Sequence, residues 1–171
     1  IIDFGVYSEA YTISPVHDHL QKAVMNDDGR IVFEPDDDFI VNQQYQVLNI
    51  RDLCNECGNC DTFCPTSGSP HRQKPGLCLS AQTLNSEHEG YMLSRLPGRE
   101  ILIYKHNESI KTLTLQDNLY IYETDQVKAT LNPMDFSLLS AEFLTPCVKE
   151  CRFNFAAEMS VIMEGARQLI Y

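Results

Sequence analysis

Four thiols lie within eleven residues of this chain, at Cys54, Cys57, Cys60 and Cys64, and a proline follows the last of them. The spacing is Cys-x2-Cys-x2-Cys-x3-Cys-Pro. Two-residue spacers let three successive thiolates reach different irons of one cubane cluster. Gly58, directly after the second cysteine, suits the tight backbone path that this wrapping requires. The run therefore predicts a [4Fe-4S] cluster with these four cysteines as ligands.

Two other uses of cysteine fit this run less well. Structural zinc usually takes two ligand pairs separated by a dozen or more residues, whereas these four cysteines are crowded together. A disulfide framework is disfavoured because the chain has seven cysteines, an odd number. Zinc remains the alternative to iron and sulfide.

The fourth ligand is open at this point. In two-cluster ferredoxins the last cysteine of such a run binds the other cluster. Either Cys64 closes the first cube, or it serves a second cube that residues outside this chain complete. We therefore expect one [4Fe-4S] cluster, or two in the second case.

Three further cysteines are candidate ligands. Cys78 lies in a flexible connection and can reach back, or it can be a small buried hydrophobe. Cys147 and Cys151 are four residues apart on a predicted helix and so share a face. Cys151 also falls on the apolar stripe of that helix, which favours a place in the core.

Composition narrows the class of protein. The chain of 171 residues is 43% hydrophobic and 22% charged, which is typical of a folded soluble protein with a sizeable core. A net charge of -11 argues against nucleic acid as a partner. No apolar run approaches the ~20 residues of a membrane span. Dense reduced thiols indicate the cytoplasm. The first residue is Ile1 rather than Met, as expected of a fragment, a processed product or an incompletely determined chain.

The segments before the motif predict one helix and two strands. Ser14-Pro15 resembles a helix start, so His17–Met25 is expected to be a short helix. The residues Ile31–Phe33 and Tyr45–Ile50 are expected to be strands, the second of which leads into the cysteine loop. After the motif, Thr66–Pro70 and Lys74–Gly76 predict loop and turn.

The segment after the motif alternates short β-rich runs with turn residues. Short links between consecutive strands predict an antiparallel meander with one packed face and one wet face. The expected strands are Tyr91–Leu96, Ile101–Lys105, Ile110–Leu115, Leu119–Glu123 and Val127–Leu131.

The C-terminal part predicts helix. A helical tail is expected after Asn132-Pro133, broken before Thr145-Pro146, where a second helix begins. Apolar residues then recur at spacings of three and four, which indicates an amphipathic helix that packs against something. They are Val148, Cys151, Phe155, Met159, Ile162, Ala166 and Leu169.

These elements predict an α+β fold, in which a ferredoxin-type [4Fe-4S] loop precedes an antiparallel β-meander and a C-terminal amphipathic helix. Four segments are expected: residues 1–44 with an N-terminal helix and an acidic loop, 45–80 binding the cluster, 81–132 forming the meander and 133–171 forming the helical end.

The segment from Asn49 through Cys60 to Cys64-Pro65, with Gly68–Pro70 and Lys74, resembles the C-terminal iron-sulfur region of proteins described as selenate reductase subunits. These are flavin-containing proteins similar to the small subunit of glutamate synthase and to dihydropyrimidine dehydrogenase. The resemblance covers residues 47–74 and implies cytoplasmic redox work with a flavin-containing domain or subunit as partner. The family's second cysteine-rich run, upstream of the motif, is missing from this chain.

Two functions follow as hypotheses. The first is an electron-transfer module that carries single electrons for a larger oxidoreductase and is not catalytic on its own. Glu56, Asp61 and Asp52 would then lower the cluster's potential if they lie close to it and are poorly solvated. The second is an interaction domain in which zinc or a structural cluster staples a loop. No dinucleotide fingerprint or phosphate loop occurs, so flavin must bind elsewhere.

Overall fold

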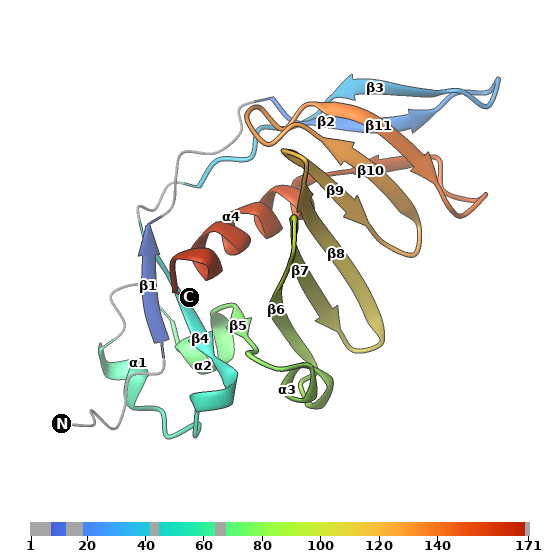
Figure 1. Ribbon diagram of the computed structural model, residues 1–171. Helices are drawn as coiled ribbons and strands as arrows, with labels where there is room; N and C mark the ends of the chain where they lie inside the picture. The colour runs from blue at the N-terminus through green and yellow to red at the C-terminus, as the bar shows by residue number, and fades with distance from the viewer. Residues whose placement is uncertain (1–7, 13–18, 42–44, 64–67, 170–171) are drawn as a thin grey trace.

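The computed structural model describes residues 8–12, 19–41, 45–63 and 68–169. Strands dominate these segments, and one long helix lies near the C-terminus (Figure 1). The strands are β1 Ser8–Thr12, β2 Gln21–Met25, β3 Ile31–Pro35, β4 Tyr45–Ile50, β5 Gly76–Leu77, β6 Glu89–Leu96, β7 Arg99–His106, β8 Ser109–Gln116, β9 Leu119–Glu123, β10 Val127–Leu131, β11 Leu138–Phe143 and β12 Glu150–Arg152. The helices are the 3-10 turn η1 Arg51–Leu53, α1 Asn59–Phe63, α2 Pro70–Gln73, α3 Ala81–Ser86 and α4 Asn154–Leu169.

Within the described residues the strands form two sheets. The larger has nine strands in the order β1-β4-β5-β6-β7-β8-β9-β10-β11, and the smaller has the order β12-β2-β3. The short strand β5 pairs in parallel with β4 and with β6, whereas the other pairs are antiparallel. The strand that leads into the cysteines therefore belongs to the same sheet as the meander.

All five strands predicted between residues 91 and 131 are confirmed as β6 to β10. Their links are tight because turn residues adopt left-handed backbone angles. Asp117 has φ of 50° and Asn118 has φ of 58°. This is the combination that a two-residue type I′ hairpin turn requires. Gly98 has φ of 78° between β6 and β7, where glycine carries no steric cost.

The large sheet curves around α4, which lies in its hollow (Figure 1). Met159, Ile162 and Ala166 are buried in the core, as the predicted apolar stripe requires. Aromatic side chains join helix and sheet: the Tyr104 and Phe155 rings lie 4.8 Å apart, measured between centroids. Burying an apolar stripe against a sheet is the main source of stability for such a helix.

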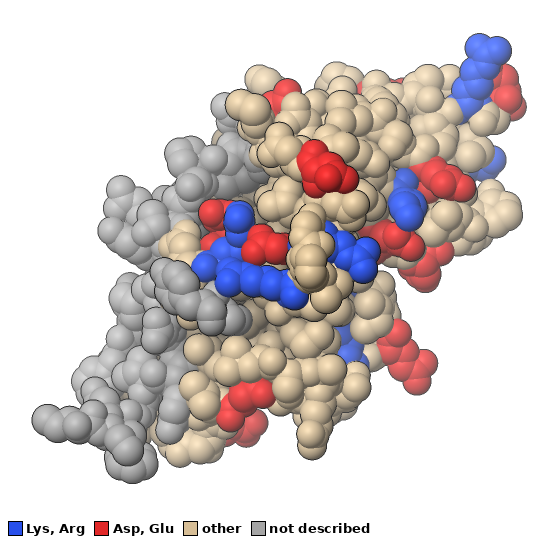
Figure 2. Space-filling view, in the orientation of Figure 1, with Lys and Arg blue, Asp and Glu red and all other residues tan. Residues whose placement is uncertain are grey.

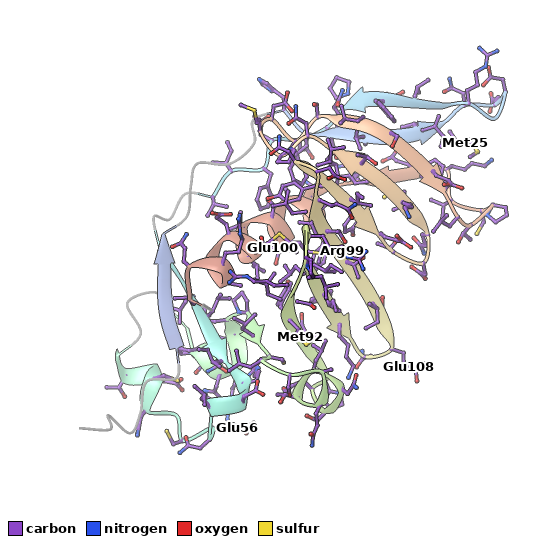
Figure 3. The ribbon with its side chains drawn as sticks, viewed as in Figure 1. Met25, Glu56, Met92, Arg99, Glu100 and Glu108 are labelled. Carbon is purple, nitrogen blue, oxygen red and sulfur yellow. The ribbon has the colours of Figure 1, made fainter. Side chains whose placement is uncertain are left out.

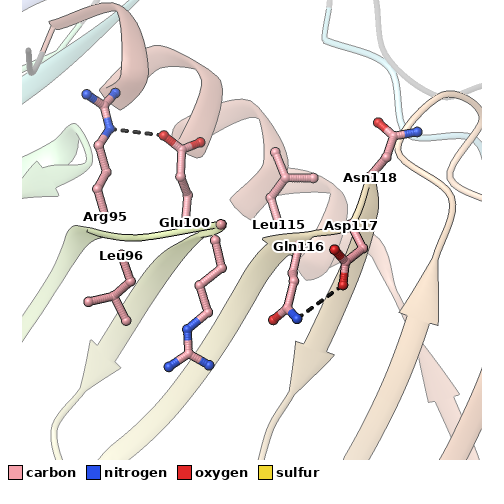
Figure 4. A pocket seen from close by; sticks show the side chains of 9 residues that line it. Arg95, Leu96, Glu100, Leu115, Gln116, Asp117 and Asn118 are labelled. Carbon is pink, nitrogen blue, oxygen red and sulfur yellow. Dashed lines mark hydrogen bonds and ion pairs between the residues drawn. The ribbon is translucent and has the colours of Figure 1, made fainter.

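Ion pairs hold the C-terminal half of α4 to the turn between β6 and β7. The Glu100 carboxylate accepts from Arg95 at 3.0 Å, drawn in Figure 4, and from Arg167 of α4 at 2.8 Å. Arg167 also pairs with Glu164 at 3.0 Å. Basic and acidic side chains meet in the middle of the face shown in Figure 2, where Figure 3 labels Glu100 and Arg99. Because these groups are partly exposed, the pairs orient the helix more than they stabilise it.

The helix predicted over His17–Met25 is wrong in the part that the structure describes. Gln21–Met25 is strand β2, which forms a hairpin with β3, while the predicted cap Ser14-Pro15 lies outside the described residues. The cause is the turn that follows, where Gly29 has φ of 80° and its amide donates to Asn26 at 2.9 Å. Pairing with two neighbouring strands outweighs the weak local helix signal.

The predicted helical tail after Asn132-Pro133 is also wrong. Leu138–Phe143 is strand β11, which pairs with β10. The final helix starts at Asn154 rather than near Thr145, because Glu150–Arg152 pairs with β2 as strand β12. Within the described segments no helix is long and apolar enough to cross a membrane.

The packing of α4 gives a test of the fold. Phe153 is fully buried just before α4, and its ring lies edge-on to Tyr122 with centroids 6.0 Å apart. Phe153→Ala should lower the free energy of unfolding by about 3–5 kcal/mol, because it removes a buried aromatic ring and leaves a cavity. Chemical denaturation measures this. Leu139→Ala is the control, because Leu139 is 53% exposed. A loss there above about 0.5 kcal/mol would contradict the assigned core.

Candidate functional site

The cysteine run begins directly after the edge-proximal strand β4. The chain leaves β4 through the 3-10 turn η1, passes Cys54 and Cys57, and enters the short helix α1, which contains Cys60. Cys64 lies outside the described residues. Figure 1 shows this segment at the end of the molecule opposite the small sheet. The strand β4 and the turn η1 thus position the start of the cysteine segment.

The backbone turns sharply between the first and third cysteines. Glu56 has φ of 55° and Gly58 has φ of 78°, two left-handed residues with only one residue between them. The Cys57 amide donates to the Asn55 side-chain oxygen at 3.2 Å, and the Asp61 amide donates to the Gly58 carbonyl at 3.0 Å. A left-handed non-glycine residue is uncommon, and the bond from the Cys57 amide to the Asn55 side chain closes an Asx turn around Glu56.

The thiols of Cys54 and Cys60 interact electrostatically. Cys54 and Cys60 are half-buried, while Cys57 is exposed. Loss of surrounding water raises the pKa of Cys60, and the charges of Asp61 and Cys54 raise it further. The backbone amide of His71 hydrogen-bonds to the same sulfur and acts in the opposite direction. A bound metal ion would favour the thiolate form of Cys60, because metal binding releases the thiol proton.

Sequence reasoning missed His71, which the fold brings to the cysteine loop. The donor atoms of Cys60, Asp61 and His71 all lie within 4.8 Å of one another. His71 is buried, and its Nδ1 lies 3.4 Å from the Asp61 carboxylate. The one-turn helix α2 lies between the two stretches predicted as loop and turn and overlaps the first at Pro70, which occupies the first turn after the cap residue Ser69. That Ser-Pro pair is the signal that could have indicated a helix there.

Arg51 ties the start of the loop to the segment that follows it. Its guanidinium donates to the His71 carbonyl at 2.6 Å and lies 3.8 Å from the Glu87 carboxylate. The Arg51 side chain lies against the backbone of Gly76, and a Cβ added to Gly76 would clash with the Arg51 Nε. Only glycine leaves this space for the arginine.

Asp52 links the start of the loop to α3. Its carboxylate accepts from the Leu79 amide at 2.6 Å, from the Thr83 hydroxyl at 2.6 Å and from the Ser80 hydroxyl at 3.4 Å. Ser80 in turn caps α3 by accepting from the Thr83 amide at 3.1 Å. Adjacent residues thus bind α2 and α3 to the turn that precedes Cys54, which limits the positions that the loop can take.

Acid groups near the cysteines differ in their surroundings. Asp61 lies against the Cys60 sulfur, with its carboxylate oxygen 3.7 Å from Sγ. The Asp52 carboxylate accepts hydrogen bonds from α3, and Glu56 is exposed at the tip of the loop (Figure 3). Asp61 is therefore the acid best placed to influence charge at the cysteines, because water screens Glu56.

Cys78 lies in the interior. It is fully buried, its amide donates to the Tyr91 carbonyl at 2.7 Å, and a Cβ added to Gly90 would lie 3.1 Å from its Sγ. Burial raises the pKa of its thiol to about 11. In this arrangement Cys78 packs as a small hydrophobe.

The prediction that Cys147 and Cys151 share a helical face is wrong. Cys151 lies in strand β12 opposite Ala23, and Cys147 lies in the exposed turn before that strand. Burial raises the pKa of Cys151 to about 11. Figure 1 shows β12 and the turn after β11 at the other end of the molecule from α1, so neither residue lies with the cysteine run.

The hydrogen bonds of Asp52 predict a pH dependence of stability. Loss of water raises the pKa of Asp52, but the bonds from Leu79 and Thr83 outweigh that effect and lower it. A lowered folded-state pKa adds stability that is present above the unfolded-state pKa and lost as the pH falls through the folded-state value. Asp52→Asn should therefore lower the free energy of unfolding above about pH 5, by less than about 1 kcal/mol because Asp52 is exposed, and the gap should narrow below about pH 4. A constant gap from about pH 3 to about pH 7 by urea denaturation would contradict this account.

Thiol labelling tests the placement of the outlying cysteines. Iodoacetamide added to the native metal-free chain at about pH 8 should modify exposed Cys147 and leave buried Cys78 unmodified, because only an accessible thiolate reacts. Peptide mass spectrometry gives the extent at each residue, and a urea-unfolded sample serves as the fully reactive control. Labelling of Cys78 as fast as that of Cys147 would show that Cys78 is not part of the core.

Comparison with known proteins gives one local match. A segment of 51 residues, 29% of this chain, is 39% identical to part of "Putative oxidoreductase YgfK" from Escherichia coli K12, and the same values hold for that protein from E. coli O157:H7. The match spans only 5% of the length of each relative. No protein-family profile matches the chain, and no solved structure matches it. A part of this chain is thus similar to a small part of a protein described as an oxidoreductase.

Proposed function

We propose that this chain is an iron-sulfur electron-transfer module, which carries single electrons through a [4Fe-4S] cluster within a larger flavin-dependent oxidoreductase. One observation carries the proposal: Cys54, Cys57 and Cys60, spaced as cluster ligands, lie on a loop that turns through left-handed residues. The local similarity to a protein described as an oxidoreductase supports the redox class.

The donor set fits such a cluster. Three thiols are half-buried or exposed and so can be reached by iron and sulfide, unlike the fully buried Cys78. Burial and the Asp61 charge raise the pKa of the Cys60 thiol, and bound iron would favour its thiolate because metal binding releases the thiol proton. Cys64 is the proposed fourth ligand on the basis of its spacing in the sequence.

The chain's own residues hold and tune the site. Cys54, Cys57 and Cys60 provide thiolates, and the His71 amide donates to the Cys60 sulfur. A donor to a ligand sulfur stabilises negative charge there and so raises the potential, while the Asp61 carboxylate acts in the opposite direction. The bonds of Arg51 and Asp52 keep the loop close to one geometry. When bound, the cluster supplies one-electron oxidation and reduction.

The proposed partner is a flavin-containing domain or subunit. In the sequence the cysteine motif resembles the iron-sulfur region of flavin-containing proteins, and no nucleotide-binding motif occurs in this chain. The acidic net charge of -11 suits docking onto a basic surface.

A second candidate is a single metal ion that staples the loop. The Cys60, Asp61 and His71 donors within 4.8 Å form a mixed thiolate, carboxylate and imidazole set that zinc accepts. In that case the domain has a structural role and no redox role. The two candidates differ in what His71 provides: its side chain for zinc, and only its backbone amide for a cluster.

Anaerobic reconstitution of the 171-residue chain with iron and sulfide separates these candidates. We expect about four irons and four sulfides per chain, or about eight of each if a second cluster is completed. Cys57→Ser should reduce both by at least half, because it removes a thiolate ligand, whereas the matched control Cys147→Ser should change neither. Metal and acid-labile sulfide analysis gives the counts.

His71→Leu supplies the discriminating control, since it keeps the backbone amide and removes the imidazole. The cluster proposal expects unchanged iron in this variant. Equal iron in Cys57→Ser and the parent chain, or a colourless parent that binds one zinc which His71→Leu abolishes, would contradict the cluster proposal and support the stapled domain.

A further inference from the structure

A second site lies beside the cysteine segment and shares only Arg51 with the residues of the proposed function. It is a partly open pocket of about 180 Å³ lined by residues of η1, α2, β5, β6 and α4 and of the link between α2 and β5. Its walls carry charged side chains of both signs from segments far apart in the sequence.

The wall formed by η1 and α2 is basic. Arg51, Arg72 and Lys74 line it. The Arg51 Nε is buried without a hydrogen bond, since the nearest acid, Glu87, lies 3.8 Å away. Among the described residues, no acidic side chain forms an ion pair with Arg72 or Lys74. Three cationic groups thus face the cavity with donors left over for an anion.

The acidic lining residues come from β6 and α4. They are Glu89 of β6 and Glu158 of α4, and Tyr91 of β6 lines the pocket with them. The protein donates to one oxygen of each carboxylate: Tyr91 to Glu158 at 3.5 Å and Tyr104 to Glu89 at 2.6 Å. Loss of surrounding water raises the pKa of Glu158. Both carboxylates are nonetheless accessible to solvent, so a cationic group of a ligand can reach them and compensate their charge.

The charge pattern and the volume restrict the ligand. The volume of about 180 Å³ lies below that of pockets for drug-sized ligands, which suits a molecule of few carbon atoms. A dicarboxylate would place its second charge against Glu89 and Glu158, and a diamine would meet the basic wall. We infer that the cavity binds a small zwitterion, an α-amino acid with a short side chain, whose carboxylate faces Arg51, Arg72 and Lys74 and whose ammonium group faces Glu158 and Glu89.

The test uses L-alanine as the probe and the full chain, with and without reconstituted iron, in isothermal titration calorimetry. We expect saturable binding of L-alanine, and affinity at least about tenfold weaker for acetate and for ethylamine, since each lacks one of the two charges. Glu158→Gln should weaken L-alanine about tenfold while leaving acetate unchanged. Lys74→Met should weaken both L-alanine and acetate.

Lys149→Met is the control, because Lys149 is exposed and lies in the turn before β12, away from the cavity. The melting temperature of each variant shows that it remains folded. The inference would be overturned by no saturable heat with L-alanine up to about 50 mM, by equal affinity for acetate and L-alanine, or by binding that neither Glu158→Gln nor Lys74→Met alters. Iron content is measured separately, so failure here leaves the cluster proposal intact, and failure to bind iron leaves the cavity result intact.

Discussion

The rest of the structure depends on the burial of α4 in the hollow of the large sheet. Met159, Ile162 and Ala166 fill that hollow against the inner side chains of the meander, and the core among the described residues centres on this contact. The strand β4 belongs to the same sheet, two strands from β6. The position of the cysteine segment therefore depends on a hydrophobic contact in which none of the described motif cysteines, Cys54, Cys57 and Cys60, takes part.

Around the cysteines, polar bonds replace apolar packing. Arg51 and Asp52 are adjacent, yet one binds α2 and the other binds the start of α3. This arrangement confines the chain on both sides of a loop that has few buried residues of its own. A ligand loop held in this way loses less conformational entropy when it closes on a bound group, which is the general benefit of preorganisation.

Much of the sheet could be predicted from the sequence, because its signals are local. Alternating β-rich runs and turn residues such as Asp117-Asn118 indicate β6 to β10 directly. The strands β2, β11 and β12 carry weaker local patterns, and pairing decides their structure: β2 pairs with β12 from far along the chain, and β11 pairs with its neighbour β10. The spacing of the motif cysteines is enough to predict them as ligands. His71 could not be predicted in this way, because α2 brings it to Cys60 through tertiary contacts. The burial of Cys78 and the position of Cys151 in a strand also do not follow from local spacing.

Electron paramagnetic resonance of the anaerobically reconstituted chain tests the central claim most directly. The account predicts a signal of a reduced cluster after dithionite, which disappears on reoxidation and returns on a second reduction, with about one spin per four irons. Reversible reduction distinguishes a cluster that carries electrons from a cluster that only stabilises the loop. A sample with stoichiometric zinc and no signal, or a signal that is lost after one cycle together with its iron, would contradict the account.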